Sequence, residues 1–268
     1  MPARRPAHPV AEPAGRPAHP VTTVYLAAMR FEAGALMRRV AGATKASDTG
    51  LRGAVSGSIA GRPVLIAVSG IGPQAARAAA EACVGLARQG RCRRVVWIGI
   101  AGALSPGLKV GDLVVATSVT AAEEPHRVRR PAIALDRELA TSAIASGCAE
   151  AVIVTTPTPV VTADERRRLW RQAGSPDRAA VDMESYEAAR VFDAAGLPFA
   201  VLRTVSDTSE DDLPVALQPA VTPTSGISIP RLALAVLRRP RAAVPLAAVR
   251  FRAARSARAL AGAAAALA

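Results

Sequence analysis

Short apolar segments alternate with longer amphipathic stretches along most of the chain. The apolar segments have the length of buried strands, and the stretches between them have the periodicity and end signals of helices. This alternation predicts a single α/β domain with a mixed, mostly parallel sheet flanked by helices. The expected strands lie near residues 24–28, 51–60, 63–68, 95–98, 113–116, 151–155 and 199–205, and the expected helices start near residue 31 and cover 73–89, 136–146, 162–173 and 183–195.

Three of the expected strands run directly into glycines or polar residues. These strand ends are residues 69–72, 99–102 and 206–207. In open α/β sheets ligands bind beyond the carboxyl ends of the strands. The pattern therefore predicts a ligand site that these three segments share.

Both ends of the chain differ in composition from its middle. Residues 1–21 are rich in Pro, Ala and Arg and contain the sequence Arg-Pro-Ala-His-Pro-Val twice, which predicts a disordered extension. Prolines interrupt residues 213–230, and the following segment to residue 268 is rich in Ala and Arg, with helices expected near 231–238 and 245–266. We expect the catalytic domain to span residues 22–212 and the last 56 residues to form a Pro-broken segment with a basic helical tail.

The positive charge of the chain is concentrated in that tail. The formal net charge is +13, and no acidic residue follows Asp212, whereas eight arginines do. Such a segment is attracted to phosphates, either of nucleic acid or of an anionic membrane surface. Nucleic acid is the less favoured partner, because no aromatic-rich basic motif or helix-turn-helix pattern accompanies the arginines. A solvated terminal helix and a peripheral membrane contact remain as alternatives.

The cysteines and the apolar runs indicate where the protein works. Cys83, Cys92 and Cys148 form no Cys-x-x-Cys pair, which is typical of a reduced cytosol and predicts no metal site. The chain has no apolar run of membrane-spanning length and no signal-peptide pattern at its start. We expect a cytoplasmic protein, with contact to the inner membrane surface as an option.

Two carboxylates stand at positions where they could share a pocket. Glu184 follows Asp182 and Met183 at the start of an expected helix, and Asp207 ends the expected strand 199–205. Taken alone, Glu184 could be an acid that stabilises the helix dipole, and Asp207 could be a helix N-cap. The residues themselves leave the structural and the functional interpretations open.

A set of five motifs resembles the nucleoside phosphorylase and nucleosidase family. They appear in the order of that family over about residues 22–208, and each is weak alone but specific in combination. They are Ala28-Met29-Arg30-Phe31-Glu32, Ser69-Gly70-Ile71-Gly72, residues 98–104 with 108–115, Ala180-Val181-Asp182-Met183-Glu184-Ser185 and Leu202-Arg203-Thr204-Val205-Ser206-Asp207. The resemblance implies an enzyme that breaks the N-glycosidic bond of a purine nucleoside.

The resemblance also implies roles for the matched residues. Cleavage builds oxocarbenium character on the ribose and negative charge on the departing purine. Asp207 matches the acid at purine N7, and burial at a strand end would favour its protonated form. Glu184 matches the carboxylate that holds the ribose hydroxyls, and Met183 matches the side chain that lies against the sugar. The remaining matched substrate-binding residues are Ser206, Gly102 through its backbone, and Arg203.

The second substrate is water or phosphate. In the hydrolytic branch of the family a Glu three positions after the Met of the first motif activates water, and Glu32 stands three after Met29. In the hexameric phosphorylase branch an Arg and a Ser near the glycine turn bind phosphate, and here Trp97 and Ile100 take these places. The departure favours hydrolysis. Inorganic phosphate stays possible as a co-substrate if Arg30 or Arg203 reaches it, and no other cofactor is expected.

The C-terminal segment narrows the resemblance to a subfamily. Leu213-Pro214, residues 237–240 and the basic helix after Pro245 resemble the hopanoid-associated phosphorylases, which implies adenosylhopane, a lipid-linked adenine nucleoside, as substrate. The alternatives are a methylthioadenosine/S-adenosylhomocysteine nucleosidase, a futalosine hydrolase, or a nucleoside-binding protein without activity. The family also implies a homo-oligomer.

Overall fold

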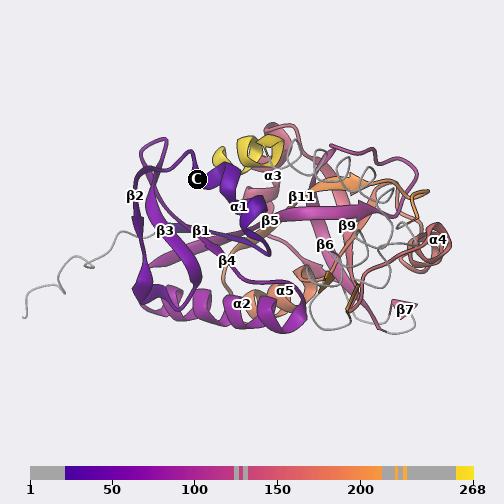
Figure 1. The fold of residues 1–268 in the computed structure, drawn as a ribbon, viewed down its shortest axis with the longest axis horizontal. Helices are drawn as coiled ribbons and strands as arrows, with labels where there is room; N and C mark the ends of the chain where they lie inside the picture. The colour runs from indigo at the N-terminus through magenta and orange to yellow at the C-terminus, as the bar shows by residue number, and fades with distance from the viewer. Residues whose placement is uncertain (1–21, 124–126, 129–131, 213–220, 223–225, 228–257) are drawn as a thin grey trace, which may run out of the picture.

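The computed structural model describes residues 22–123, 127–128, 132–212, 221–222, 226–227 and 258–268, and their core is one large mixed sheet (Figure 1). Eleven described strands belong to this sheet, with the central order β10-β9-β6-β11-β5-β1-β4-β3-β2. The strands are β1 (Thr22–Ala27), β2 (Ala41–Lys45), β3 (Arg52–Ile59), β4 (Arg62–Val68), β5 (Cys92–Ala103), β6 (Leu113–Glu123), β7 (Arg127–Val128), β8 (Ile133–Ala134), β9 (Ala149–Thr155), β10 (Ala179–Asp182) and β11 (Phe199–Asp207). β12 (Val221–Thr222) and β13 (Gly226–Ile227) form a separate pair.

Parallel strands form the centre of the sheet, as the alternating pattern predicted. β4, β1, β5 and β11 are parallel to one another, and β6, β9 and β10 form a second parallel group that joins β11 antiparallel through β6. β10 also pairs antiparallel with β5, so β5, β11, β6, β9 and β10 close into a ring. The carboxyl ends of β5 and β11 therefore lie side by side at one edge.

Helices cover both faces of the sheet (Figure 1). α2 and α5 pack on one face, and α1, α3 and a C-terminal helix at residues 258–265 pack on the other, while α4 lies at the far end of the sheet. The helices are α1 (Arg30–Met37), α2 (Pro73–Arg88), α3 (Arg137–Ala145), α4 (Ala163–Gln172) and α5 (Ser185–Ala194), with a short 3-10 helix, η1, at Ser47–Thr49. This arrangement confirms the predicted fold class.

The core is mainly aliphatic, as the low aromatic content of 3% requires. β1 shows the pattern best, because five of its six residues are buried and it runs through the middle of the sheet. Three buried aromatic side chains cluster on the face covered by α2 and α5, whereas Tyr25 is buried on the opposite face. Within the cluster Phe192 packs 6.5 Å from Trp97 and 5.5 Å from Phe199, measured between ring centroids.

Two strands were not predicted from the sequence pattern, and one helix begins later than predicted. The later start of that helix shapes the site. β2 consists of exposed residues, so no apolar run marked it, and β10 has only four residues, too few for a periodic signal. α5 begins at Ser185 rather than at residue 183. Met183 and Glu184 therefore lie in the turn between β10 and α5, where their side chains are not committed to a helical face.

The described C-terminal helix at residues 258–265 packs against the core of the domain. Leu260 and Ala264 are at most 1% exposed and pack in the cluster that contains Tyr25 and Leu36. The Tyr25 hydroxyl donates a hydrogen bond to the Ala264 carbonyl at 2.9 Å. The predicted extension at residues 1–21 and the predicted helix at 231–238 lie outside the described residues, as does the part of the 245–266 helix before residue 258.

We expect Leu260→Ala to lower the free energy of unfolding by about 2–4 kcal/mol, because it removes buried methyl groups and leaves a cavity. Urea unfolding followed by circular dichroism measures the change. Arg258→Ala is the matched control, since Arg258 is exposed on the same helix, and it should stay within about 0.5 kcal/mol of wild type. Equal stability of all three proteins would show that the helix contributes nothing to the fold.

None of the helices in the described residues is long and apolar enough to span a lipid bilayer.

Candidate active site

Glu32 is held at the junction between α1 and the carboxyl end of β5. It occupies the third position of α1 in a capping box, where its carboxylate accepts a hydrogen bond from the Met29 backbone N–H at 2.8 Å. The other carboxylate oxygen accepts from the backbone N–H of Ile100 at 3.0 Å. The residue is only 3% exposed. Glu32 therefore fixes the start of its helix and also places a carboxylate against the strand end predicted to bind a ligand.

The glycine at position 99 makes room for two charged groups. A Cβ atom on Gly99 would lie 2.9 Å from the Glu32 Oε1 and 3.0 Å from Nη1 of Arg203, both closer than such atoms approach. Glu32 and Arg203 thus pass directly over the backbone of β5. Gly99 lies within β5 rather than in the expected glycine turn, and its missing side chain permits the close approach of these two groups.

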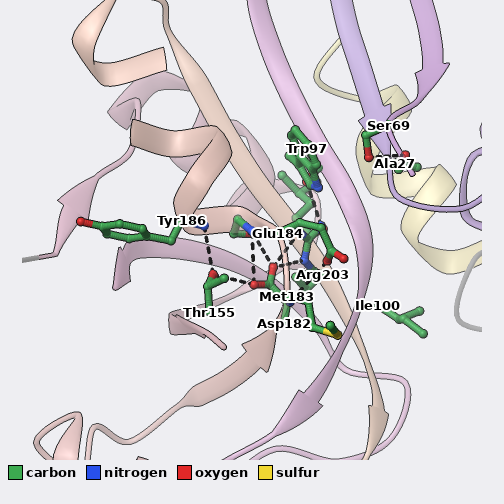
Figure 2. Close-up of polar contacts among 12 residues, drawn as sticks. Ala27, Ser69, Trp97, Ile100, Thr155, Asp182, Met183, Glu184, Tyr186 and Arg203 are labelled. Carbon is green, nitrogen blue, oxygen red and sulfur yellow. Dashed lines mark hydrogen bonds and ion pairs between the residues drawn. The ribbon is translucent and has the colours of Figure 1, made fainter. Parts of the chain in front are cut away.

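The guanidinium of Arg203 is hydrogen-bonded to the protein groups around it (Figure 2). Its Nε and Nη2 donate to the Oδ2 of Asp182 at 3.0 and 2.8 Å, and Nη2 also donates to the Ser185 hydroxyl at 2.7 Å. Nη1 donates to the carbonyl of Trp97 at 3.4 Å. Arg203 is 1% exposed. These contacts use the donors of Arg203 within the protein, and its substrate-binding role stays a prediction.

Asp182 is the centre of the same buried network. Besides Arg203 it accepts hydrogen bonds from the hydroxyl of Thr155 at 2.7 Å and from the backbone N–H of Ser185 at 3.3 Å. The Thr155 hydroxyl in turn accepts from the backbone N–H of Tyr186 at 2.9 Å. Asp182 therefore fixes the turn between β10 and α5 in which Met183 and Glu184 stand (Figure 2).

Glu184 is held across the same turn. Its Oε1 accepts a hydrogen bond from the Gly72 backbone N–H at 2.8 Å, and Oε2 accepts from the Met183 N–H at 3.3 Å. Gly72 has a φ of 90°, a conformation that favours glycine. Met183 is partly exposed beside the 8% exposed Glu184. The motif at residues 69–72 and the motif at 180–185 thus meet through this hydrogen bond.

Burial raises the proton affinity of both carboxylates near β5. Desolvation raises the pKa of Glu32, opposed by the N–H of Ile100 and the charge of Arg203. Desolvation, together with the nearby negative charge of Asp182, raises the pKa of Glu184 to about 7. A carboxylate with a raised pKa is a stronger base than an exposed one. The site therefore holds two carboxylates whose pKa values are raised, that of Glu184 to about 7.

Asp207 lies at the other end of this strand edge, opposite Gly102 on β5. One carboxylate oxygen is hydrogen-bonded to the Ser206 hydroxyl, which also donates to the Ala101 carbonyl at 3.2 Å. The other oxygen forms an ion pair with Arg166 of α4. The Asp207 side chain is 33% exposed. The burial expected to favour its protonated form is therefore not found, and its role as an acid stays a prediction.

Trp97 and Ile100, which replace the phosphate-binding residues of the phosphorylase branch, have different environments. Trp97 is 1% exposed and its ring packs in the core against Phe192. Ile100 is partly exposed beside Glu32. Arg30 is exposed at the start of α1, with a guanidinium nitrogen 3.7 Å from where a Cβ of Gly53 would stand. Among the predicted phosphate contacts, only Arg30 has a guanidinium not already enclosed by the protein.

The structure brings the predicted residues together in two groups along β5. Glu32, Glu184, Met183 and Arg203 gather around residues 99–100, and Asp207 and Ser206 gather at Gly102. Sequence reasoning missed Asp182 as the support of this site, although its motif was noted, and it missed Arg166 entirely. In the described residues no group of three or more His, Cys, Asp or Glu side chains is arranged to hold a metal ion.

The raised pKa of Glu184 predicts a pH-dependent stability. Because the folded state binds this proton more tightly than the unfolded state, the contribution is complete below pH 4.5 and is lost as the pH rises through about 7. Relative to Glu184→Gln, wild type should therefore lose on the order of 3 kcal/mol of unfolding free energy between pH 4.5 and 8. Urea unfolding of both proteins at several pH values tests this, and parallel pH curves would contradict it.

Comparison with known proteins places this geometry in a family. The profile of the phosphorylase superfamily matches residues 22–238. A 5′-methylthioadenosine/S-adenosylhomocysteine nucleosidase of Shewanella denitrificans is 31% identical over 177 residues, which cover 60% of this chain and 75% of the relative.

Solved structures share the fold. A 5′-methylthioadenosine/S-adenosylhomocysteine nucleosidase from Neisseria meningitidis, in complex with methylthio-immucillin-A, superposes with a TM-score of 0.67 at 22% identity, covering 92% of this chain and 97% of that one. The futalosine hydrolase of Helicobacter pylori gives a TM-score of 0.66 at 19% identity, again covering 92% and 97%. The family match covers most of the chain and includes every residue of the candidate site. This chain belongs to the phosphorylase superfamily and is an enzyme of that family.

Proposed function

We propose that the protein hydrolyses the N-glycosidic bond of an adenine nucleoside. The observation that carries the proposal is the buried carboxylate of Glu32, which lies against the backbone of Ile100 at the ligand-binding end of β5. A carboxylate in this place can accept a proton from water. The nucleosidases to which the chain is similar support the choice of substrate class.

The two ends of the site are separated by a distance that suits a nucleoside. Glu32 contacts β5 at Ile100 and Asp207 contacts it at Gly102, two residues or about 7 Å further along the strand. A ribose placed between them would have its C1′ within reach of a water bound by Glu32, and its purine beside Asp207. Glu184 would then accept hydrogen bonds from the ribose hydroxyls, and Met183 would contact the sugar.

Phosphorolysis is the less favoured alternative. A phosphate dianion needs cationic or hydrogen-bonding partners when it is partly buried. The buried carboxylate of Glu32 would repel it, and the guanidinium of Arg203 is already paired with Asp182. Arg30 is exposed at the start of α1 and is the remaining predicted phosphate contact.

Base release in phosphate-free buffer tests the proposal. We expect full activity toward 5′-methylthioadenosine without phosphate, with adenine and 5-methylthioribose as the products and less than a twofold change when phosphate is added. Strict dependence on phosphate, with a sugar 1-phosphate as product, would replace hydrolysis by phosphorolysis.

A lipid-linked adenine nucleoside such as adenosylhopane is the second candidate substrate. Phe31, directly before Glu32, is 44% exposed, and Ile100 adds a partly exposed apolar side chain beside the same carboxylate. Seven of the eight C-terminal arginines lie at residues 231–255, outside the described part of the chain, and Arg258 lies within it. Apolar side chains at the site would suit a triterpene, and arginines would suit an anionic membrane surface.

Competition between substrates separates the two candidates. Equal amounts of adenosylhopane in anionic vesicles, 5′-methylthioadenosine and futalosine are incubated with the enzyme, and release of each base is followed. A higher kcat/KM for the vesicle-bound nucleoside supports the lipid substrate, and the reverse order supports a small soluble one. If the vesicle-bound nucleoside is preferred, we propose that the enzyme is a cytoplasmic homo-oligomer that contacts the inner membrane surface.

A further inference from the structure

Arg166 is a buried cation on a helix whose neighbouring positions are exposed. Its side chain is 6% exposed, whereas Arg167 and Arg168 on the same turn of α4 are exposed. Arg167 pairs with Asp164 at the surface, in the way expected of a solvated helix. Burying a guanidinium is costly unless its donors are used. The burial of Arg166 therefore requires an explanation, whereas the exposure of its neighbours does not.

The protein uses only part of the hydrogen-bonding capacity of Arg166. One terminal nitrogen forms the ion pair with Asp207, and Nη1 donates to the Ala103 carbonyl at 3.2 Å. Nε is buried without a partner. A guanidinium has five N–H donors and no acceptor. The protein therefore leaves donor capacity of a buried cation unused at the carboxyl end of β5.

The glycine at position 102 leaves room at this end of β5 for the ion pair between Arg166 and Asp207. A Cβ atom on Gly102 would clash with Nη1 of Arg166 and lie 2.8 Å from the Oδ2 of Asp207. Any other residue at position 102 would thus displace both charged groups. The same two groups stand where the proposed function places the purine, next to Ser206 and Gly102.

We propose that Arg166 is the cation of the base subsite, where it donates hydrogen bonds to the purine and stabilises the negative charge of the departing base. The inference rests on the proposed hydrolysis. When the bond between C1′ and N9 breaks, its electron pair goes to the purine and is delocalised to the ring nitrogens. Water forms the new bond to C1′ and gives its proton to Glu32. Arg166 remains protonated throughout, because it donates hydrogen bonds only, and the base takes its proton from solvent as Glu32 returns one.

The ion pair with Asp207 orients the guanidinium of Arg166 at the proposed position of the purine. Stabilisation of developing charge by a preorganised donor is usually a large contribution to catalysis. Arg166 acts on the leaving group, whereas Glu32 acts on the nucleophile.

Binding of free adenine tests the subsite without requiring turnover. The proteins compared by titration calorimetry are wild type, Arg166→Met, Arg166→Lys and the control Arg167→Met, which changes an exposed arginine of the same helix. We expect Arg166→Met to weaken adenine binding about 10–100-fold, Arg166→Lys to weaken it less because the charge is kept, and Arg167→Met to stay within twofold. Equal adenine affinity in wild type and Arg166→Met overturns the inference.

Leaving-group dependence separates the catalytic role from a structural one. The substrates are the adenine nucleoside that wild type cleaves best and the same nucleoside with 6-chloropurine, a better leaving group. Arg166→Met should raise the ratio of the two kcat/KM values at least tenfold, because the poorer leaving group depends more on the cation. An unchanged ratio overturns the catalytic role. If wild type cleaves no nucleoside but binds adenine in an Arg166-dependent way, the proposed function fails and the base subsite stands. If it neither cleaves nor binds, both fail.

Discussion

Glu32→Gln is expected to lower kcat for base release by about 10³-fold, since general-base catalysis contributes about 10²–10⁴-fold and an amide cannot accept the proton of the attacking water. KM should change little, because Glu32 contacts the nucleophile rather than the ribose or the base. In wild type the ionised form of Glu32 is the active one, so kcat should rise with pH through a value above the 4.5 of an ordinary glutamate. Steady-state kinetics in phosphate-free buffer measure both effects.

A second capping-box glutamate provides the control for this prediction. Glu165 occupies the same third position at the start of α4, where its carboxylate accepts from the backbone N–H of Thr162 at 3.1 Å. Glutamine is accepted in a capping box, so both Glu32→Gln and Glu165→Gln should stay folded, with similar melting temperatures. Only Glu32→Gln should lose activity. Near-normal turnover by Glu32→Gln would reduce Glu32 to a helix cap.

The central part of the fold could be predicted because its strands are buried on both faces. β1 and β11 are almost entirely buried, and their apolar runs at residues 24–27 and 199–202 distinguish them from the helices between them. β2 could not be predicted in this way, because all of its residues are exposed and its pairing with β3 is set by backbone hydrogen bonds. The C-terminal helix was assigned to a basic tail because its burial depends on α1 and β1, which are more than 200 residues away in the chain.

The candidate site was predictable where a residue has a local motif and not where its role depends on burial. Glu32 and Glu184 stand in motifs of the family. Arg166 stands in the sequence Asp-Glu-Arg-Arg-Arg-Leu-Trp-Arg, which indicates a solvated helix, and nothing local separates it from Arg167 or Arg168. Only the approach of α4 to β5 and β11 decides which of the three arginines is buried. The resemblance likewise assigned Arg203 to the substrate, whereas its partner Asp182 lies 21 positions earlier in the chain.

The ion pair between Asp182 and Arg203 should have the largest effect on stability. Both side chains are 2% exposed, and Asp182 also fixes Thr155 and Ser185. Asp182→Ala should lower the free energy of unfolding by about 3–5 kcal/mol, because it leaves the Arg203 charge buried without its partner. Urea unfolding measures the loss, and Arg167→Ala, which breaks a surface pair, should change it by less than about 1 kcal/mol.

The double variant Asp182→Ala/Arg203→Met tests whether the unpaired charge is the cause. Removing both charges should cost less than Asp182→Ala alone, because no ion then remains in the core. The same pair of variants connects the fold to the site. In Asp182→Ala the freed guanidinium stays close to Glu32 and should favour its ionised form. In the double variant that charge is absent, so the rise of kcat with pH, its acid limb, should move to higher pH. If the two substitutions lower the stability additively, the unpaired charge of Arg203 is not the cause of the loss. If the acid limb of kcat is the same in both variants, Arg203 does not influence the ionisation of Glu32.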